Sequence, residues 1–134
     1  MSSNNHHKAR VLIVDDDVDF MRINGRVLRQ DGYEVVEAYT GADGLEKARE
    51  TKPDAVLLDF MMESNTEGAS VAQTLREDAA FKTTPILLVT AVRRIKPWWN
   101  GVKPDQDWLP VDKVLDKPVA PEKLLAELQE VLAK

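Results

Sequence analysis

The sequence predicts an α/β fold in which a doubly wound, five-stranded parallel sheet lies between two helical layers, a (βα)5 three-layer sandwich. From Arg10 onward, short apolar runs alternate five times with stretches of helical period, as in repeated βαβ units. The apolar runs are continuous, which is typical of strands buried on both faces. The 134 residues suffice for one such domain, which we expect to span residues 10–134 after a flexible tail at residues 1–9.

The first two strand and helix units follow directly from this pattern. The run Val11 to Val14 predicts the first strand. Four apolar residues at helical spacing predict the helix that follows: Phe20, Ile23, Val27 and Leu28. The turn at Asp31 to Gly32 ends that helix, and Tyr33 to Ala38 predicts the second strand. Thr40 can cap a second helix, which Pro53 prevents from continuing.

The third and fourth strands are predicted from two further buried runs. Ala55 to Leu58 forms the third strand and ends in Asp59. A polar loop then reaches Gly68, and a helix is expected from Ala69 to Glu77. Ile86 to Val89 predicts the fourth strand.

The pattern predicts a final strand and helix, but it predicts no regular helix in the segment before them. Val114 and Leu115 predict a short fifth strand, and Pro121 suits the first turn of a final helix. That helix carries one apolar stripe: Leu124, Leu125, Leu128, Val131 and Leu132. Between Ala91 and Pro110, prolines break any long helix and all three tryptophans of the chain occur, so the fourth helix region is atypical.

Composition excludes several classes of function. The chain has no cysteine, which excludes disulfides, thiolate zinc sites and cysteine nucleophiles. Its apolar runs are too short to span a membrane, and its polar start lacks the apolar stretch of a signal peptide. We therefore expect a cytoplasmic protein without membrane contact. The formal net charge of −5 argues against direct binding to nucleic acid.

Polar residues follow four of the predicted strands. Strand one is followed by Asp15 and Asp16, strand three ends in Asp59, strand four in Thr90, and strand five leads to Lys117. Because ligands of doubly wound sheets bind beyond the carboxyl ends of the strands, these side chains are expected to converge. One acidic run alone is also common at a solvated turn or helix start. The combination predicts a functional site.

The residue types indicate the chemistry of this site. Clustered carboxylates repel one another unless a cation lies among them, and an all-oxygen cluster suits Mg²⁺. A threonine hydroxyl and a lysine on the same edge can donate to an incoming phosphoryl group. Phosphoryl transfer requires positioning and charge neutralisation, which this set of residues supplies.

Four segments carry a resemblance to a known family: Val11-Leu-Ile-Val-Asp-Asp-Asp17, Leu57-Leu-Asp-Phe-Met-Met62, Val89-Thr-Ala91 and Asp116-Lys-Pro118. From Arg10 to Ala133 the sequence resembles the receiver domain of two-component response regulators, whose fold is flavodoxin-like. The resemblance implies a signalling switch rather than a turnover enzyme. It also implies a sensor histidine kinase or phosphotransfer protein as phosphoryl donor and a downstream protein target.

The same resemblance implies roles for individual residues. Asp59 would be the phosphoacceptor that takes the phosphoryl group from a phosphohistidine. Asp16, Asp59 and the Met61 backbone carbonyl would ligate Mg²⁺ directly, with Asp15 acting mostly through a water.

The resemblance further implies that Thr90 donates its hydroxyl to a phosphoryl oxygen and that Lys117 pairs with another. It also implies that the peptide bond between Lys117 and Pro118 is cis, an arrangement that proline makes inexpensive.

Three departures from the family pattern affect these expectations. Glu63 and Glu67 stand where receivers usually carry a proline and a glycine, with Gly68 one residue later, so the loop after the acceptor is longer by one. The usual switch aromatic is replaced by Val114, which predicts a changed readout. Met61 and Val92 cannot hydrogen-bond a hydrolytic water, which predicts slow self-dephosphorylation.

Three alternative functions can be compared with the same residues, and the sequence argues against two of them. The departures are also compatible with a receiver-like interaction module that needs no phosphate. A Mg²⁺-dependent phosphatase with an aspartyl nucleophile would carry a second acid where this chain has Met61. Flavin or nucleotide binding would need a Gly-rich or hydroxyl-rich turn after strand one, where this chain is acidic.

Overall fold

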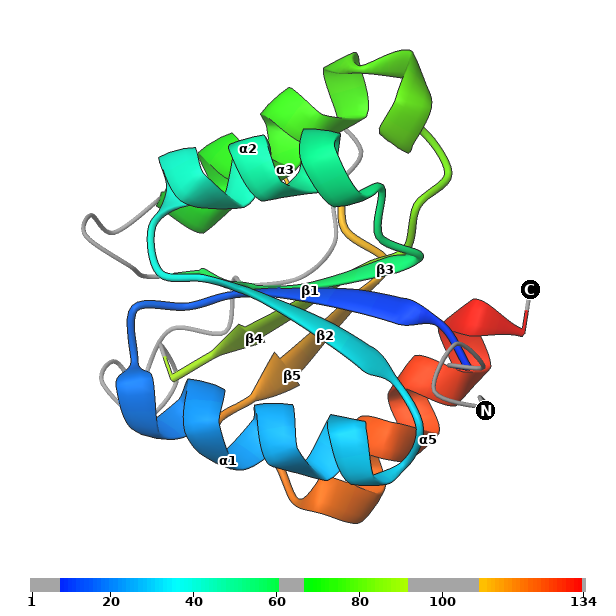
Figure 1. Ribbon diagram of the computed structural model, residues 1–134. Helices are drawn as coiled ribbons and strands as arrows, with labels where there is room; N and C mark the ends of the chain where they lie inside the picture. Colours follow the sequence, from blue (N-terminus) through cyan, green and yellow to red (C-terminus); the bar gives the residue numbers. More distant parts are fainter. Residues whose placement is uncertain (1–7, 61–66, 92–108, 134) are drawn as a thin grey trace.

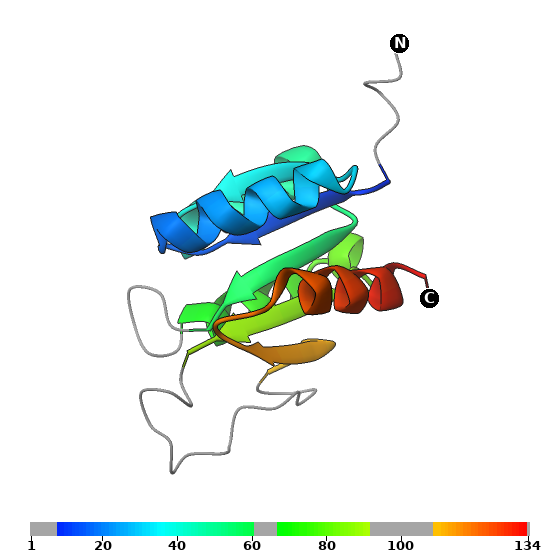
Figure 2. The same ribbon diagram turned by 90° about the horizontal axis from the view of Figure 1, so that it is seen from below.

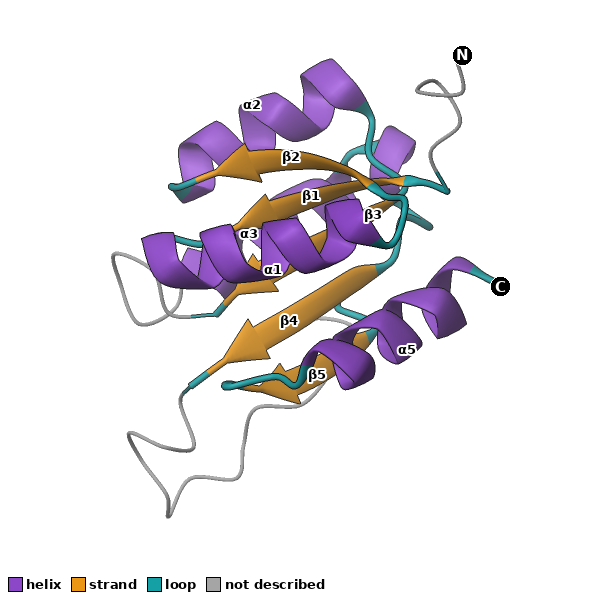
Figure 3. Ribbon diagram, turned by 60° about the horizontal axis from the view of Figure 1, so that its bottom comes forward, coloured by secondary structure: helices purple, strands orange, loops and turns teal. Residues whose placement is uncertain are grey.

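The protein is described by a computed structural model that covers residues 8–60, 67–91 and 109–133. Its five strands are β1 (Arg10–Val14), β2 (Glu34–Ala38), β3 (Ala55–Asp59), β4 (Ile86–Thr90) and β5 (Lys113–Asp116). They form one sheet in the order β2-β1-β3-β4-β5, and every pair is parallel. All arrowheads therefore point the same way in Figure 3. The predicted five-stranded parallel sheet is confirmed.

The helices cover both faces of the sheet. They are α1 (Val18–Gln30), α2 (Gly41–Thr51), α3 (Glu67–Glu77) and α5 (Pro121–Leu132), with a short 3-10 helix at Ala79–Phe81. Helices α2 and α3 lie on one face, and α1 and α5 lie together on the other (Figures 1 and 2). The described ranges contain four α-helices. The atypical region expected between β4 and β5 falls at residues 92–108, outside them.

Two apolar clusters hold the layers together, one on each face of the sheet. Alternate residues of β1 point to opposite faces, so Leu12 and Val14 pack beneath α2 and α3 while Val11 and Ile13 pack beneath α1 and α5. All four side chains are buried. The continuous apolar runs are thus explained by helices on both faces.

Local signals explain where the helices begin and end. The carboxylate of Asp17 accepts a hydrogen bond from Phe20 N at 3.1 Å and caps α1. Gly32, with a φ of 99°, follows the end of this helix. The Thr40 hydroxyl accepts from Asp43 N and caps α2, as the sequence predicts. Pro121 occupies the first turn of α5, also as predicted.

The buried face of α1 does not coincide with its apolar residues. Its buried residues are Met21, Asn24, Gly25 and Leu28, whereas the side chain of Ile23 is 54% exposed. The helix that Ile23 helps to predict is therefore present, but Ile23 itself faces solvent. The true stripe contains a glycine and a hydrogen-bonded asparagine, so apolar periodicity alone places the face incorrectly.

Element boundaries shift slightly from the predictions. Helix α3 begins at Glu67 rather than Ala69, and β5 extends over Lys113–Asp116 rather than two residues. Before β5, Leu109 and Val111 are buried against the α2 and α3 face. Val114 is partly buried against the same cluster. The return to the sheet is therefore anchored by apolar packing.

The start of the described chain contacts the turn after α1. Lys8 N donates to Gly32 O at 2.9 Å, and the Lys8 ammonium pairs with the Asp31 carboxylate at 2.7 Å. Lys8 belongs to the segment expected to be a flexible tail, and the boundary of that tail stays a prediction. Among the described residues, no helix is long and apolar enough to cross a bilayer.

Candidate functional site

The polar residues that follow β1 and β3 meet at one edge of the sheet. We call Asp15, Asp16, Asp59, Thr90 and Lys117 the carboxyl edge. The carboxylates of Asp15, Asp16 and Asp59 offer oxygens that all lie within 4.8 Å of one another. Asp15 is 1% exposed and Asp59 is 5% exposed, whereas Asp16 is exposed. The structure therefore brings together three of the four residues predicted as metal ligands. Met61, the fourth, lies outside the described residues.

Backbone pairing fixes these positions. Asp15 N donates to Ala38 O at 3.0 Å, which extends the β1 and β2 pairing one residue past β1. Thr90 is the last residue of β4 and is 1% exposed. Lys117 N donates to Thr90 O at 2.9 Å, so Lys117 is held beside the end of β4. The strand register alone thus places Asp15, Thr90 and Lys117 at the same edge.

Lys117 lies between the two buried carboxylates. Its ammonium is 2.9 Å from Asp15 Oδ2 and 3.8 Å from Asp59 Oδ2, and its side chain is 13% exposed. On another side, the ammonium lies 4.5 Å from the centroid of the Phe20 ring. The peptide bond between Lys117 and Pro118 is cis, as the resemblance implies.

The electrostatics of the carboxyl edge favour an additional cation. Burial raises the pKa of Asp15, and the Lys117 ammonium together with the N–H of Asp17 only partly offset this effect. The contact between Asp15 Oδ2 and Lys117 is an ion pair that lacks hydrogen-bond geometry. Within the described ranges, this oxygen is the only buried polar side-chain atom without a hydrogen bond. Its partner is the ammonium of Lys117, which it shares with the Asp59 carboxylate.

The residues of the carboxyl edge fit a magnesium ion. Mg²⁺ prefers carboxylate, carbonyl and water oxygens, and the three aspartates supply an all-oxygen set. One ammonium cannot neutralise three carboxylates, so a divalent cation would relieve the remaining repulsion. The oxygen donors and the surplus negative charge of the carboxyl edge therefore both fit a divalent cation.

Gly68 contributes to the site through its backbone. A side-chain carbon at this position would lie 2.3 Å from Asp59 O and 2.6 Å from Phe60 Cα, so only glycine allows the approach. Gly68 N also donates to Phe60 O at 3.0 Å. The sequence shows that Gly68 follows a longer loop, but its contact with the backbone after β3 could not be predicted. It fixes where the chain leaves Asp59.

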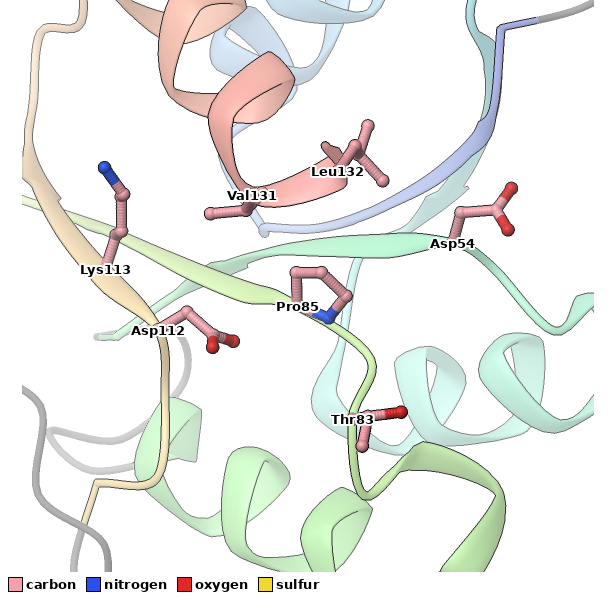
Figure 4. A pocket seen from close by; sticks show the side chains of 7 residues that line it. All are labelled: Asp54, Thr83, Pro85, Asp112, Lys113, Val131 and Leu132. Atoms are coloured by element: carbon pink, nitrogen blue, oxygen red, sulfur yellow. The ribbon is translucent and has the colours of Figure 1, made fainter. Parts of the chain in front are cut away.

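A second polar site lies at the opposite edge of the sheet. A cavity of about 340 Å³ is lined by Asp54, Thr83, Pro85, Asp112, Lys113, Val131 and Leu132 (Figure 4). Its carboxylates already have partners, because Asp54 accepts from Arg10 N at 2.8 Å and Asp112 accepts from Ile86 N at 2.7 Å. Both bonds support strand ends. This cavity is therefore distinct from the carboxyl edge in its chemistry.

Comparisons with known proteins agree with this geometry. A family model described as a response regulator receiver domain matches residues 11–129. The chain is 34% identical to protein PilH of Pseudomonas aeruginosa over 126 residues, which covers 93% of this chain and 98% of that protein. The chemotaxis response regulator CheY4 of Vibrio cholerae matches with a TM-score of 0.75 and 31% identity, over 92% of this chain and 98% of that one.

Several relatives are longer than this chain. It is 34% identical over 133 residues to hybrid signal transduction histidine kinase D of Dictyostelium discoideum, which covers 96% of this chain and 8% of that protein. It spans about half the length of the transcriptional regulators that it also matches, between 46% and 50%. In each case the matched stretch covers 93–96% of this chain.

Proposed function

The chain belongs to the response regulator receiver domain family of two-component signalling, and from this premise we propose that Asp59 accepts a phosphoryl group with the help of Mg²⁺. One observation carries the proposal: the carboxylates of Asp15, Asp16 and Asp59 lie within 4.8 Å of one another, beside the ammonium of Lys117. Asp59 ends a central strand and is 5% exposed, so its carboxylate has a fixed position at the edge of the sheet.

The proposed reaction is transfer from a phosphohistidine of a histidine kinase or a phosphotransfer protein. A carboxylate oxygen of Asp59 forms a bond to phosphorus while the phosphorus–nitrogen bond of the donor breaks. The electron pair of that bond stays on the imidazole, which takes up a proton. The product is an acyl phosphate on Asp59 and a neutral histidine on the donor. The residues around Asp59 need only orient the groups and neutralise charge.

The donors around Asp59 have separate tasks. A bound Mg²⁺ supplies positive charge that offsets the repulsion between the carboxylate and the phosphoryl oxygens. Asp15, Asp16 and Asp59 would hold it. Lys117 already contacts two carboxylates, so its ammonium can pair with a phosphoryl oxygen close to Asp59. Thr90, at the end of the neighbouring strand, can donate its hydroxyl to another.

The wider setting follows from the family. We propose that the protein acts in the cytoplasm as a switch whose phosphorylation changes its binding to a downstream protein. The Trp-containing segment and Met61 lie outside the described residues.

Acetyl phosphate provides a test that requires no partner protein. We expect intact-mass spectrometry to show one phosphate adduct in the presence of Mg²⁺, and none when the metal is chelated. Asp59→Asn should abolish the adduct. Asp112→Asn is the matched control, because it makes the same change at the opposite edge of the sheet and should leave the adduct intact. An adduct that survives in Asp59→Asn would contradict the proposal.

One observation favours a second candidate function. Val114 occupies the position of the family's switch aromatic, and it packs against the cluster beneath α2 and α3. A module that binds its partner without phosphorylation would not need the aromatic. Backbone amide chemical shifts distinguish the two functions. A phosphorylated protein whose shifts change only at the carboxyl edge would favour the phosphate-independent module, whereas changes that reach β5 and α5 would favour the switch.

A further inference from the structure

Lys117 makes a contact that the phosphoryl-transfer chemistry does not explain. Its ammonium lies 4.5 Å from the centroid of the Phe20 ring, within the range of a cation–π interaction. The carboxylates of Asp15 and Asp59 lie at 2.9 Å and 3.8 Å from the same nitrogen. The ammonium is therefore enclosed by two anions and one aromatic ring, and its side chain is only 13% exposed.

Phe20 itself is held in place by the acidic run that precedes α1. Asp17 N donates to Asp15 Oδ1 at 2.9 Å, and Asp17 Oδ1 accepts from Phe20 N at 3.1 Å. The buried Asn24 donates its side-chain amide to Phe20 O at 2.9 Å. The contacts thus form a closed circuit that runs from Asp15 through Asp17, Phe20 and Lys117 back to Asp15.

We propose that Phe20 is a positioning residue for Lys117, an inference that rests on the proposed function. The ring attracts the ammonium with its electron-rich face and excludes water from that side. Because the ring carries no net charge, it holds the ammonium without adding to the repulsion among the carboxylates. Because the ring covers one side of the ammonium, the N–H groups of Lys117 are directed to the side where Asp59 and an incoming phosphoryl oxygen lie.

Substitutions of Phe20 can separate the effect of its aromatic face from the effect of its apolar packing. Phe20 also packs against the apolar cluster beneath α1 and α5. A leucine would retain most of that apolar contact but would lack the aromatic face, whereas a tyrosine would retain both. Phe81 provides the matched control, because it is a buried phenylalanine in the other cluster, beneath α2 and α3.

The first measurement places the ring beside Lys117 in solution. The proton chemical shifts of the Lys117 side chain are recorded by NMR with isotope-labelled lysine and assigned with Lys117→Arg. We expect an upfield shift from the ring current in the wild-type protein and in Phe20→Tyr. This shift should be lost in Phe20→Leu and retained in Phe81→Leu. Its absence from the wild-type protein would overturn the proposal, and this readout does not depend on phosphorylation.

The second measurement tests the consequence for transfer. With acetyl phosphate and saturating Mg²⁺, we expect Phe20→Leu to slow phosphorylation by about threefold to tenfold, the size expected for a partly buried cation–π contact. Phe20→Tyr and Phe81→Leu should react at close to the wild-type rate. Equal rates in wild type and Phe20→Leu would overturn the inference alone. So would equal slowing in Phe20→Leu and Phe20→Tyr, because the ring would then act only through packing. A wild-type protein that takes no phosphoryl group would instead overturn the proposed function, and the role of Phe20 in transfer with it.

Discussion

The two edges of the sheet use the same charged residue types in opposite ways. The amino edge consists of Asp54, Arg76, Asp112 and Lys113, where the strands begin. There, the guanidinium of Arg76 donates to the carbonyl oxygens of Phe81, Thr84 and Pro110 and to the Asp112 carboxylate, at 2.6–3.0 Å. At the carboxyl edge, by contrast, three carboxylates crowd around one ammonium and Asp15 Oδ2 lacks a hydrogen bond.

This difference indicates that the amino edge stabilises the fold and that the carboxyl edge is suited to bind a ligand. Charges at the amino edge are used to join strand ends, as when Asp112 accepts from Ile86 N. At the carboxyl edge, three carboxylates surround one ammonium, so a surplus of negative charge remains. A fold whose stability resides at one edge can keep the other in an unfavourable state until a cation and a phosphoryl group bind.

The largest effect is expected where the backbone of the carboxyl edge is tightest. Gly68→Ala would place a carbon 2.3 Å from Asp59 O, so the chain after β3 must move. We expect the free energy of unfolding to fall by about 3 kcal/mol, at the upper end of the cost of overpacking. Urea denaturation measures this change in the free energy of unfolding. Gly25→Ala is the control, because the nearest obstacle there is the mobile end of the Arg29 side chain. An equal loss in both variants would contradict a special role for Gly68.

The next largest effect is expected at the amino edge. Arg76→Met keeps an unbranched side chain but removes every donor, which leaves the carbonyls of Phe81, Thr84 and Pro110 without this partner. We expect the free energy of unfolding to fall by about 2 kcal/mol. The extent of phosphorylation by acetyl phosphate should be unchanged in the fraction that is folded. A loss of phosphorylation in fully folded Arg76→Met would break the separation between the two edges.

A single substitution made at each edge should act with opposite sign. Without Mg²⁺, Asp15→Asn removes one of the crowded carboxylates and should raise the free energy of unfolding by about 1 kcal/mol. Asp112→Asn weakens the bond to Arg76 and should lower it by about 1 kcal/mol. Thermal denaturation in a chelating buffer compares the two. Destabilisation by both substitutions would show that the carboxyl edge is not under electrostatic strain.

The smallest effect concerns pH at the amino edge. The Lys113 ammonium lowers the pKa of Glu127 below its usual 4.5, opposite in direction to the shift of Asp15. Because the folded pKa is the lower one, the contact stabilises the protein above pH 4.5 and is lost as pH falls through the folded value. Glu127→Gln should reduce the loss of stability between pH 5 and pH 3 by about 0.3 kcal/mol, as for an ion pair that solvent still reaches. Identical pH profiles would contradict this contribution.

The carboxyl edge could be predicted from the sequence because parallel strands deliver their ends to one side. Asp59 directly follows an apolar run and Lys117 follows another one residue after it, so their convergence requires only the strand order. The sequence thus identifies the candidate site and the five strands.

Other features left no readable pattern. Arg76 donates to backbone carbonyls from two separate segments, residues 81–84 and Pro110, and no residue type marks a carbonyl as a partner. Phe20 reads as one more apolar residue of a helix, and its contact with Lys117 becomes visible only in three dimensions. The buried stripe of α1 cannot be located from apolar residues alone, because Asn24 and Gly25 lie within it. Contacts between distant segments, rather than local propensity, decide these positions.

If the surplus carboxylates of the carboxyl edge make Asp59 a phosphoacceptor, the modified residue must be Asp59 itself, and its position can be mapped. The protein is treated with acetyl phosphate and Mg²⁺, and borohydride then reduces any aspartyl phosphate to homoserine, which tandem mass spectrometry locates. We predict homoserine at position 59, only when Mg²⁺ is present. Homoserine at another aspartate, or none at any position while the protein remains folded, would contradict the claim.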